Sequence, residues 1–269
     1  MLLSSVIIIL REVLEAALLF SIFIALSKQL GFSLQWVGWS VLFGLLGAIT
    51  YGFNIDVVSE WYEGVGQEVS NAFLQLGIYF MLVVYMMILI RVINHQKISK
   101  SVLTVIMIIV SSLAITREGS EIILYFFSVT RSDNHLIAVL IGMTIGASIG
   151  ISIGLLFYYL LTNLVPKWSF IIGLVLMILV AAAMISQASL LLIQADWLPA
   201  QLPLWDTSDW LSERSAAGQL LYALIGYEAT PTAIQAGLYL CGLMLPVILI
   251  TGLQIKFNSQ NKTQSKAVD

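Results

Sequence analysis

Two short strings of charged residues share the pattern Arg-Glu-x-x-Glu, and both lie inside long apolar stretches. They are Arg11-Glu12-Val13-Leu14-Glu15 and Arg117-Glu118-Gly119-Ser120-Glu121. Residues three and four positions apart share one face of a helix, so each string would point two carboxylates and one guanidinium in the same direction. Each charge at the centre of a membrane helix costs about 2.5–3.5 kcal/mol, so six unpaired charges would cost on the order of 15–20 kcal/mol. The repetition of so unfavourable a pattern indicates a functional site.

The chemistry that suits this pattern is the binding of a hard metal ion by oxygen. If the two helices cross near the middle of the membrane, four carboxylates converge beside two arginines, with a net charge of minus two. Carboxylate oxygens are hard ligands that favour hard cations. The arginines would stabilise the empty site and would be displaced when a cation binds. The alternative is that these groups pair only to hold two helices together, although charges inside a membrane most often mark a functional site.

The composition predicts an all-α integral membrane protein. The chain has 269 residues, of which 59% are hydrophobic and 10% are charged. That balance is typical of a protein with several membrane spans. Runs of about 20 apolar residues, the length that crosses a bilayer, predict seven transmembrane helices. They are residues 3–26, 34–57, 69–93, 102–130, 136–161, 170–194 and 233–255.

The spacing of the charged strings predicts an internal repeat. Arg117 lies 106 positions after Arg11 (117 minus 11), and the same offset places the second and third spans over the fifth and sixth. The two copies would cross the membrane in opposite directions, and transporters built from such inverted repeats bind their substrate where the halves meet. The predicted parts are repeat one (1–100), repeat two (101–195), an outer loop (196–232), the seventh helix (233–255) and a cytoplasmic polar tail (256–269), with 1–255 as a single transmembrane domain.

Basic residues predict the orientation of the chain. In a seven-span layout, one side carries Lys28, Arg91, Lys97, Lys100, Lys167, Lys256, Lys262 and Lys266. The other side carries only Arg131 and Arg214. Because Lys and Arg concentrate in cytoplasmic loops, the N-terminus is expected outside and the C-terminus in the cytoplasm. The outer loops are rich in Asp and Glu, which would concentrate cations at the entrance.

Glycine recurs at every fourth position of the fifth span, at Gly142, Gly146, Gly150 and Gly154, and the second span is also rich in glycine. Such faces let another helix approach closely. They predict either close packing within the monomer or the interface of a homo-oligomer.

Three acidic residues before the third span are a candidate outer capture site. They are Glu60, Glu63 and Glu68. Glu60 and Glu63 repeat the Glu-x-x-Glu spacing, which one helical turn would align. The group would capture an incoming cation or form a solvated acidic loop.

The long outer loop carries a weaker candidate set, Asp206, Asp209 and Glu228. These acids would contact a metal ion at the outer surface. For Glu228 the alternative is that the carboxylate complements the N-terminus of the seventh helix. Residues 215–227 are expected to form a short helix packed against the bundle.

At these residues the chain resembles the high-affinity iron permeases of fungi and bacteria, whose hallmark is R-E-G-[LS]-E. The second string matches that hallmark, and the first departs from it at Val13, where the family usually has Gly. Position 13 lies on another helix face from the charges, so the departure bears on helix packing more than on metal ligation. Segments 204–208, 218–221 and 226–228 resemble the bacterial members.

The resemblance covers about residues 1–255 and implies an iron permease rather than an enzyme. It implies that iron, in the ferric form, enters the cytoplasm across a bacterial inner membrane as a transported substrate and not as a bound cofactor. The motif residues carried over are the iron-coordinating Glu12, Glu15, Glu118 and Glu121, with Arg11 and Arg117 as companions on the path. Family members commonly work with a separate oxidase or an extracytoplasmic iron-handling protein, and no nucleic-acid partner is expected.

Carboxylate ligands leave another ion open as the substrate. The alternative is a transporter of another oxygen-loving divalent cation, such as lead or manganese, with or without protons moving through the same glutamates. A membrane di-iron enzyme fits poorly, because such sites use Glu-x-x-His pairs and the two histidines, His95 and His135, lie in predicted loops. A receptor or a purely structural role is the remaining class.

Overall fold

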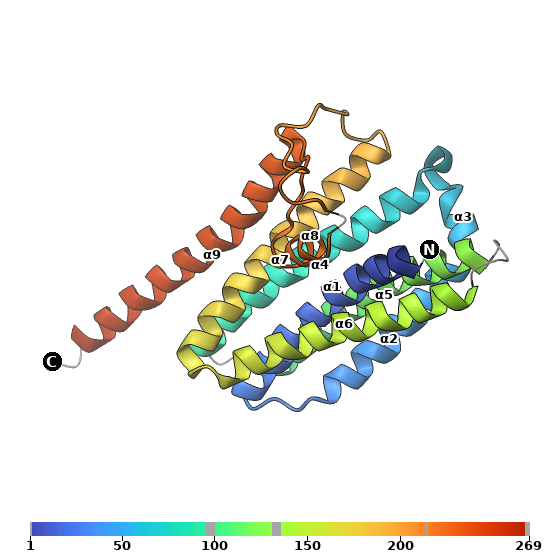
Figure 1. The fold of residues 1–269 in the computed structure, drawn as a ribbon. Helices are drawn as coiled ribbons and strands as arrows, with labels where there is room; N and C mark the ends of the chain where they lie inside the picture. The colour runs from blue at the N-terminus through green and yellow to red at the C-terminus, as the bar shows by residue number, and fades with distance from the viewer. Residues whose placement is uncertain (1, 95–99, 131–135, 214, 267–269) are drawn as a thin grey trace.

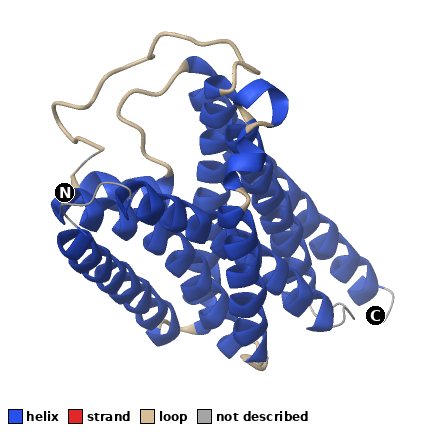
Figure 2. Cartoon of the chain, turned by 90° about the vertical axis from the view of Figure 1, so that its right-hand side faces the viewer, coloured by secondary structure: helices blue, strands red, loops and turns tan. Residues whose placement is uncertain are grey.

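The computed structural model describes residues 2–94, 100–130, 136–213 and 215–266, with side chains as far as residue 255. Within these residues the chain is built from helices and loops, and no β-strand is present (Figure 2). The helices are α1 (Leu2–Gln29), α2 (Gln35–Phe53), α3 (Ile55–Ser59), η1 (Trp61–Gly64), α4 (Gly66–Ile93), α5 (Lys100–Thr130), α6 (Leu136–Asn163), α7 (Pro166–Gln194), α8 (Ala216–Ile225) and α9 (Ala233–Lys266). Five residues used in the sequence predictions lie outside the described residues, namely His95, Lys97, Arg131, His135 and Arg214.

Six helices are long and apolar enough to cross a membrane: α2, α4, α5, α6, α7 and α9. They correspond to six of the seven spans predicted from the sequence. With 28 residues, α1 is also long enough. α1 carries its charged string near the middle and Lys28 in its last turn, so charged residues interrupt its apolar sequence.

Several helix boundaries differ from the sequence prediction by a few residues, and two of these differences have a local cause in the sequence. α2 ends at Phe53 rather than at residue 57, because the chain turns at Asn54 into the short α3. α9 passes residue 255 and continues to Lys266, so the helix extends into the polar tail. That stretch contains neither Gly nor Pro before Lys266, and its Gln and Lys residues are good helix formers.

The short helix expected in the outer loop is present as α8, and local sequence signals explain both of its ends. Ser215 is the N-cap, and its Oγ accepts a hydrogen bond from the Gly218 N–H at 3.0 Å. Gly226 ends the helix in the left-handed conformation, with a φ of 66° that glycine adopts without strain. α8 packs against α1 and α7, so part of the outer loop folds back into the bundle.

Three pairs of long helices pack most closely: α1 with α6, α2 with α5, and α4 with α7 (Figure 1). The first pair is close because four glycines of α6 face α1, at Gly142, Gly146, Gly150 and Gly154. α2 approaches α5 in the same way, with Gly44 against Ile115. These glycine faces are therefore used within the monomer, and a homo-oligomer, which stays a prediction, would need another surface.

The exposed surface of the long helices is apolar, as expected for helices that face lipid. Leu45 on α2, Leu156 on α6 and Ile248 on α9 are 50%, 66% and 62% exposed. A water-soluble monomer rarely exposes so much contiguous apolar surface. The buried core lies between α1, α4, α5 and α7 and includes Phe23 and Tyr85, whose ring centroids are 4.9 Å apart.

Candidate metal centre

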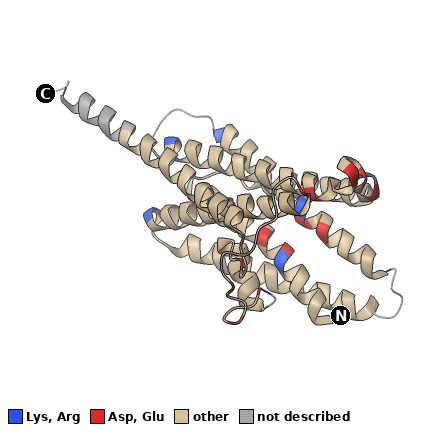
Figure 3. Ribbon diagram, turned by 90° about the horizontal axis from the view of Figure 1, so that it is seen from above, with Lys and Arg blue, Asp and Glu red and all other residues tan. Residues whose placement is uncertain are grey.

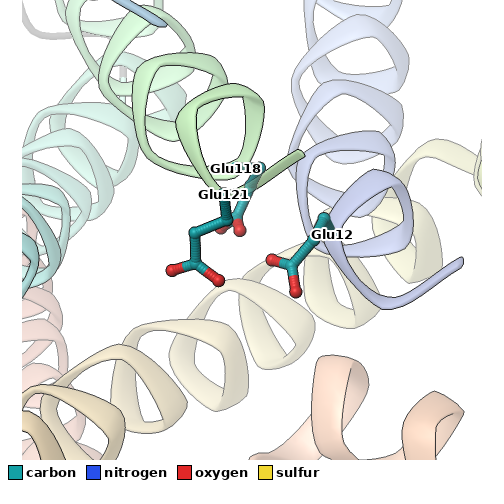
Figure 4. A group of neighbouring side chains, drawn as sticks. All are labelled: Glu12, Glu118 and Glu121. Carbon is teal, nitrogen blue, oxygen red and sulfur yellow. The ribbon is translucent and has the colours of Figure 1, made fainter. Parts of the chain in front are cut away.

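α1 and α5 bring the two charged strings together in the bundle. Carboxylate oxygens of Glu12, Glu118 and Glu121 all lie within 4.8 Å of one another (Figure 4). Oxygen ligands that share a hard cation sit about 2.0–2.6 Å from it, so ligands on opposite sides of the ion are about 4–5 Å apart. Among the described residues, these three glutamates are the group of potential metal ligands whose side chains lie close enough together to hold a metal ion.

Arg117 links the two strings. Its Nη1 lies 3.1 Å from Glu15 Oε2 on α1 and 2.5 Å from Glu118 Oε1 on its own helix. Its Nη2 lies 3.3 Å from Glu121 Oε1. The side chain is only 5% exposed, and a guanidinium that donates in several directions from one plane suits this bridging position.

Arg11 lies at the more open edge of the same cluster. Its side chain is 33% exposed, and its Nη2 lies 2.8 Å from Glu12 Oε1 and 3.6 Å from Glu121 Oε2. The guanidinium also sits over the ring of Tyr222 on α8, 5.5 Å from the ring centroid. α8 therefore helps to position the first string through a cation–π contact.

The carboxylates are buried, and their hydrogen-bonding capacity is not used up. The Glu12 and Glu118 side chains are 1% and 4% exposed, whereas Glu121 is 22% exposed. Glu12 Oε2 and Glu118 Oε2 have no hydrogen-bond donor among the described residues. Like charges so close repel one another, so the group favours binding a cation or sharing a proton.

A sequence model described as the iron permease FTR1 family matches residues 2–257. The chain belongs to this family. Neither a curated protein nor a solved structure matches the chain. The family is one of iron transporters, which agrees with the apolar helices and with a buried carboxylate group that suits a hard cation.

Glu15, the fourth predicted ligand of the permease, lies apart from the three-carboxylate group. Glu15 Oε2 contacts Arg117, and the side chain is 2% exposed. Its other oxygen, Oε1, has no hydrogen-bond donor among the described residues. In this structure Glu15 is therefore placed to hold Arg117 rather than to complete the group.

The departure from the family hallmark at Val13 is matched by the packing of the helices. A Cβ at Gly150 on α6 would lie 3.0 Å from Val13 Cγ1, so Val13 occupies the space that this glycine leaves. At the equivalent place in the second string, a Cβ at Gly119 would lie 2.8 Å from Ala48 Cβ on α2. The small residue thus lies on α6 at one interface and on α5 at the other.

The three predicted capture residues separate into two environments. Glu60 and Glu63 are exposed near η1, where Glu63 has a φ of 66°. Glu68 lies in the first turn of α4 and lines a cavity that Glu121 also lines. The structure therefore brings Glu68 towards the charged strings and leaves the other two at the surface.

The outer-loop acids do not gather with one another. Asp206 and Asp209 are exposed, and a hydrogen bond from the Ser208 backbone N–H at 2.9 Å lowers the pKa of Asp206. Glu228 is largely buried and accepts a hydrogen bond from Gln235 Nε2 at 2.7 Å. Burial, together with the nearby Glu213 carboxylate, raises the pKa of Glu228 to about 7.

Sequence reasoning missed several polar residues close to the site. Tyr222 contacts Arg11, and Asn71 lines the cavity shared by Glu68 and Glu121. Asn71 offered a signal, because an amide within an apolar span is uncommon and usually faces the interior of a bundle. The contact of Tyr222 could not be found from its sequence position, because it depends on how the outer loop folds back.

Proposed function

We propose that this permease carries ferric iron into the cytoplasm through a site formed by Glu12, Glu118 and Glu121. The supporting observation is the convergence of three carboxylates from two helices within 4.8 Å. Their combined charge of minus three balances a ferric ion, and carboxylate oxygens are the hard ligands that such an ion prefers. Iron is the transported substrate of this site.

In this proposal the arginines regulate the charge of the empty site. Arg117 contacts Glu15, Glu118 and Glu121, and Arg11 contacts two of the metal-binding carboxylates. When the ion binds, each arginine gives up a carboxylate oxygen, and Glu15 keeps Arg117 paired. Because the arginines compete with the ion for these oxygens, they weaken its net binding and make its release easier, so the ion does not remain trapped.

The proposed transmembrane domain comprises residues 1–255. Six of its seven spans form two inverted repeats, 1–100 and 101–195, and α9 is the added seventh. A twofold axis that relates the two repeats would exchange α1 with α5, α2 with α6, and α4 with α7. It would map the α1–α6 pair onto the α5–α2 pair and keep α4 with α7. Those are the three closest helix pairs, which supports the repeat. The loop 196–232 and the cytoplasmic tail 256–269 lie outside the repeats.

The proposed orientation has the N-terminus outside and the C-terminus in the cytoplasm of a bacterial inner membrane. Its support is the separation of charge, with acidic residues towards one end of the bundle and most basic residues towards the other (Figure 3). Cytoplasmic loops are the ones rich in Lys and Arg. A separate oxidase or extracytoplasmic iron-handling protein would deliver iron to the acidic end.

The decisive experiment is iron uptake by the purified chain in liposomes, with ferric and ferrous iron supplied separately. Wild type would be compared with Glu118→Gln, which removes one ligand charge without changing the shape of the side chain. Asp56→Asn, at an exposed acid of α3, is the matched control. We expect ferric uptake in wild type and in the control, and loss of uptake in Glu118→Gln.

Other outcomes would overturn parts of the proposal. Ferrous uptake alone would refute the ferric assignment. Uptake of manganese or lead without iron would refute iron as the substrate. Normal uptake by Glu118→Gln would refute the site.

A further inference from the structure

A polar cavity of about 300 Å³ lies between α4, α5 and α7, beside the three-carboxylate group. Two leucines and five polar residues line it, the polar ones being Gln67, Glu68, Asn71, Glu121 and Gln194. Two carboxylates and three amides therefore converge in one space among membrane helices. Lipid-facing helices do not gather such groups without a use, because each is expensive to remove from water.

Asn71 is the residue that indicates a ligand. Its side chain is part of the cavity wall, and the residue is only 3% exposed. Its Oδ1 has no hydrogen-bond partner among the described residues. A buried acceptor left unpaired costs about 1–3 kcal/mol, and nearly all such groups in folded proteins are satisfied. Asn71 thus brings to the cavity wall an acceptor without a protein partner, which a rotation of the side-chain amide would present to a ligand.

Glu121 belongs both to this cavity and to the three-carboxylate group. Its side chain is 22% exposed, against 1% for Glu12 and 4% for Glu118. Glu121 is therefore the carboxylate of that group that the cavity reaches. A cation in the cavity could meet Glu121 before it meets the two deeper carboxylates.

One helical turn deeper, a pair of amides joins the cavity walls. Gln75 lies four residues after Asn71 on α4, and Gln187 lies four residues before Leu191, a cavity-lining residue of α7, so each shares a face with a wall residue. Gln75 Nε2 donates to Gln187 Oε1 at 2.7 Å, and the two residues are 0% and 3% exposed. This contact ties α4 to α7 one turn below the cavity. The acidic side of the cavity is therefore the side that faces Glu121.

We propose that this cavity is a loading site for a hydrated cation, with oxygen atoms of Glu68, Asn71 and Glu121 as its ligands. Hard cations accept a mixture of carboxylate, amide and water oxygens, and the cavity supplies the first two and has room for the third. The ion then passes to Glu12 and Glu118 along Glu121, whose carboxylate belongs to both groups and can bridge an ion in each. The loading site rests on the proposed function, because the ion that it loads is the transported one.

The test uses the full chain in liposomes and measures the KM and the maximal rate of ferric citrate uptake. Glu68→Gln and Asn71→Leu should each raise KM by about tenfold or more, which is the loss of affinity expected when one contact to a charged group is removed. The maximal rate should stay near that of wild type. Asn71→Asp keeps an oxygen ligand and should stay close to the wild-type KM. Glu118→Gln, in contrast, should lose the maximal rate.

A second measurement counts ions by titration with terbium, a trivalent ion that seeks oxygen ligands and luminesces when bound. Wild type should bind two ions, and Glu68→Gln should bind one. Unchanged KM values in Glu68→Gln and Asn71→Leu, or one ion in wild type that transports iron, would overturn the loading site while the permease site stands. Two bound ions without any iron uptake would overturn the proposed function instead and leave the loading site supported.

Discussion

Arg117 Nη1 lies 3.1 Å from Glu15 Oε2, and both side chains are almost completely buried. This contact joins α5 to α1, because the two residues come from different copies of the charged string. Breaking a buried ion pair by removing one partner costs about 3–5 kcal/mol, since a buried charge is left unpaired. The pair therefore connects the position of one string to that of the other.

Replacing Arg117 by Lys should impair transport more than replacing Arg11 by Lys. An ammonium cannot contact Glu15, Glu118 and Glu121 together in the geometry of a planar guanidinium, whereas Arg11 is one-third exposed and has fewer partners. We expect iron uptake in liposomes to fall by about tenfold or more in Arg117→Lys, the effect of one lost charge-assisted contact. Equal activities of the two variants would contradict this ordering.

Glu15→Gln should weaken the protein more than it weakens metal binding. Gln retains the shape but leaves the Arg117 charge without its partner on α1. We expect a lower thermal transition temperature in detergent, by about 5–10 °C if about 3 kcal/mol, the lower end of that range, is lost, with terbium affinity near wild type. The comparison is Glu12→Gln, in which the affinity itself should fall.

Gly119→Val should disrupt the contact between α5 and α2. Even the Cβ atom of a side chain at position 119 would lie only 2.8 Å from Ala48 Cβ. Overpacking of this kind costs about 1–3 kcal/mol. The double variant Gly119→Val with Ala48→Gly should recover part of the lost thermal stability. Additive losses in the double variant would show that the two positions are not in contact.

Tyr222→Leu should lower the affinity for iron by a few-fold, because Arg11 loses the ring over which it sits. Cation–π contacts contribute about 0.5–2 kcal/mol, depending on their exposure. Tyr222→Phe keeps the ring and serves as the matched control. If both variants have the same KM for uptake, whether raised or not, the ring is not what positions Arg11.

The buried Glu228 carboxyl should make the stability of the outer segment depend on pH. Its folded pKa of about 7 lies above the ordinary value of 4.5, so the folded chain binds this proton more tightly than the unfolded chain. The stabilisation is fully present below about pH 4.5 and is lost as the pH rises through about 7. The thermal transition temperature should therefore fall from pH 5 to pH 8.

Glu228→Gln tests this pH dependence directly, because Gln imitates the protonated carboxyl at every pH. The variant should show a smaller fall in transition temperature and should be more stable than wild type at pH 8. The exposed Asp209 offers the control Asp209→Asn, which should keep the wild-type slope. The same slope in Glu228→Gln would assign the pH dependence to another group.

The sequence predicted the helices well because membrane spans are long, uniform and easily separated from loops. Six predicted spans have counterparts of similar bounds among the candidate spans. The boundary at residue 57 failed because Ile55, Val57 and Val58 continue the apolar pattern, whereas the backbone turns at Asn54. Hydropathy measures composition, and it does not register a bend between two helices.

The charged strings could be predicted to converge, but the partner of each charge could not. Spacing placed Glu12 and Glu15 on one face of a helix, yet Glu12 joins the carboxylate group and Glu15 contacts Arg117. That difference depends on how α1 and α5 are rotated about their axes. The rotation is set by packing against α6 and α2, which a single sequence does not display.

The exchange of partners among the helices has a consequence for how the protein could move. α1 packs mainly on α6, and α5 packs mainly on α2, with a smaller contact between α1 and α5. If each close pair behaves as a rigid unit, Glu12 travels with one unit, and Glu118 and Glu121 travel with the other. Any motion that separates the two units also divides the coordination sphere, so separation of the units and release of the ion would be a single event.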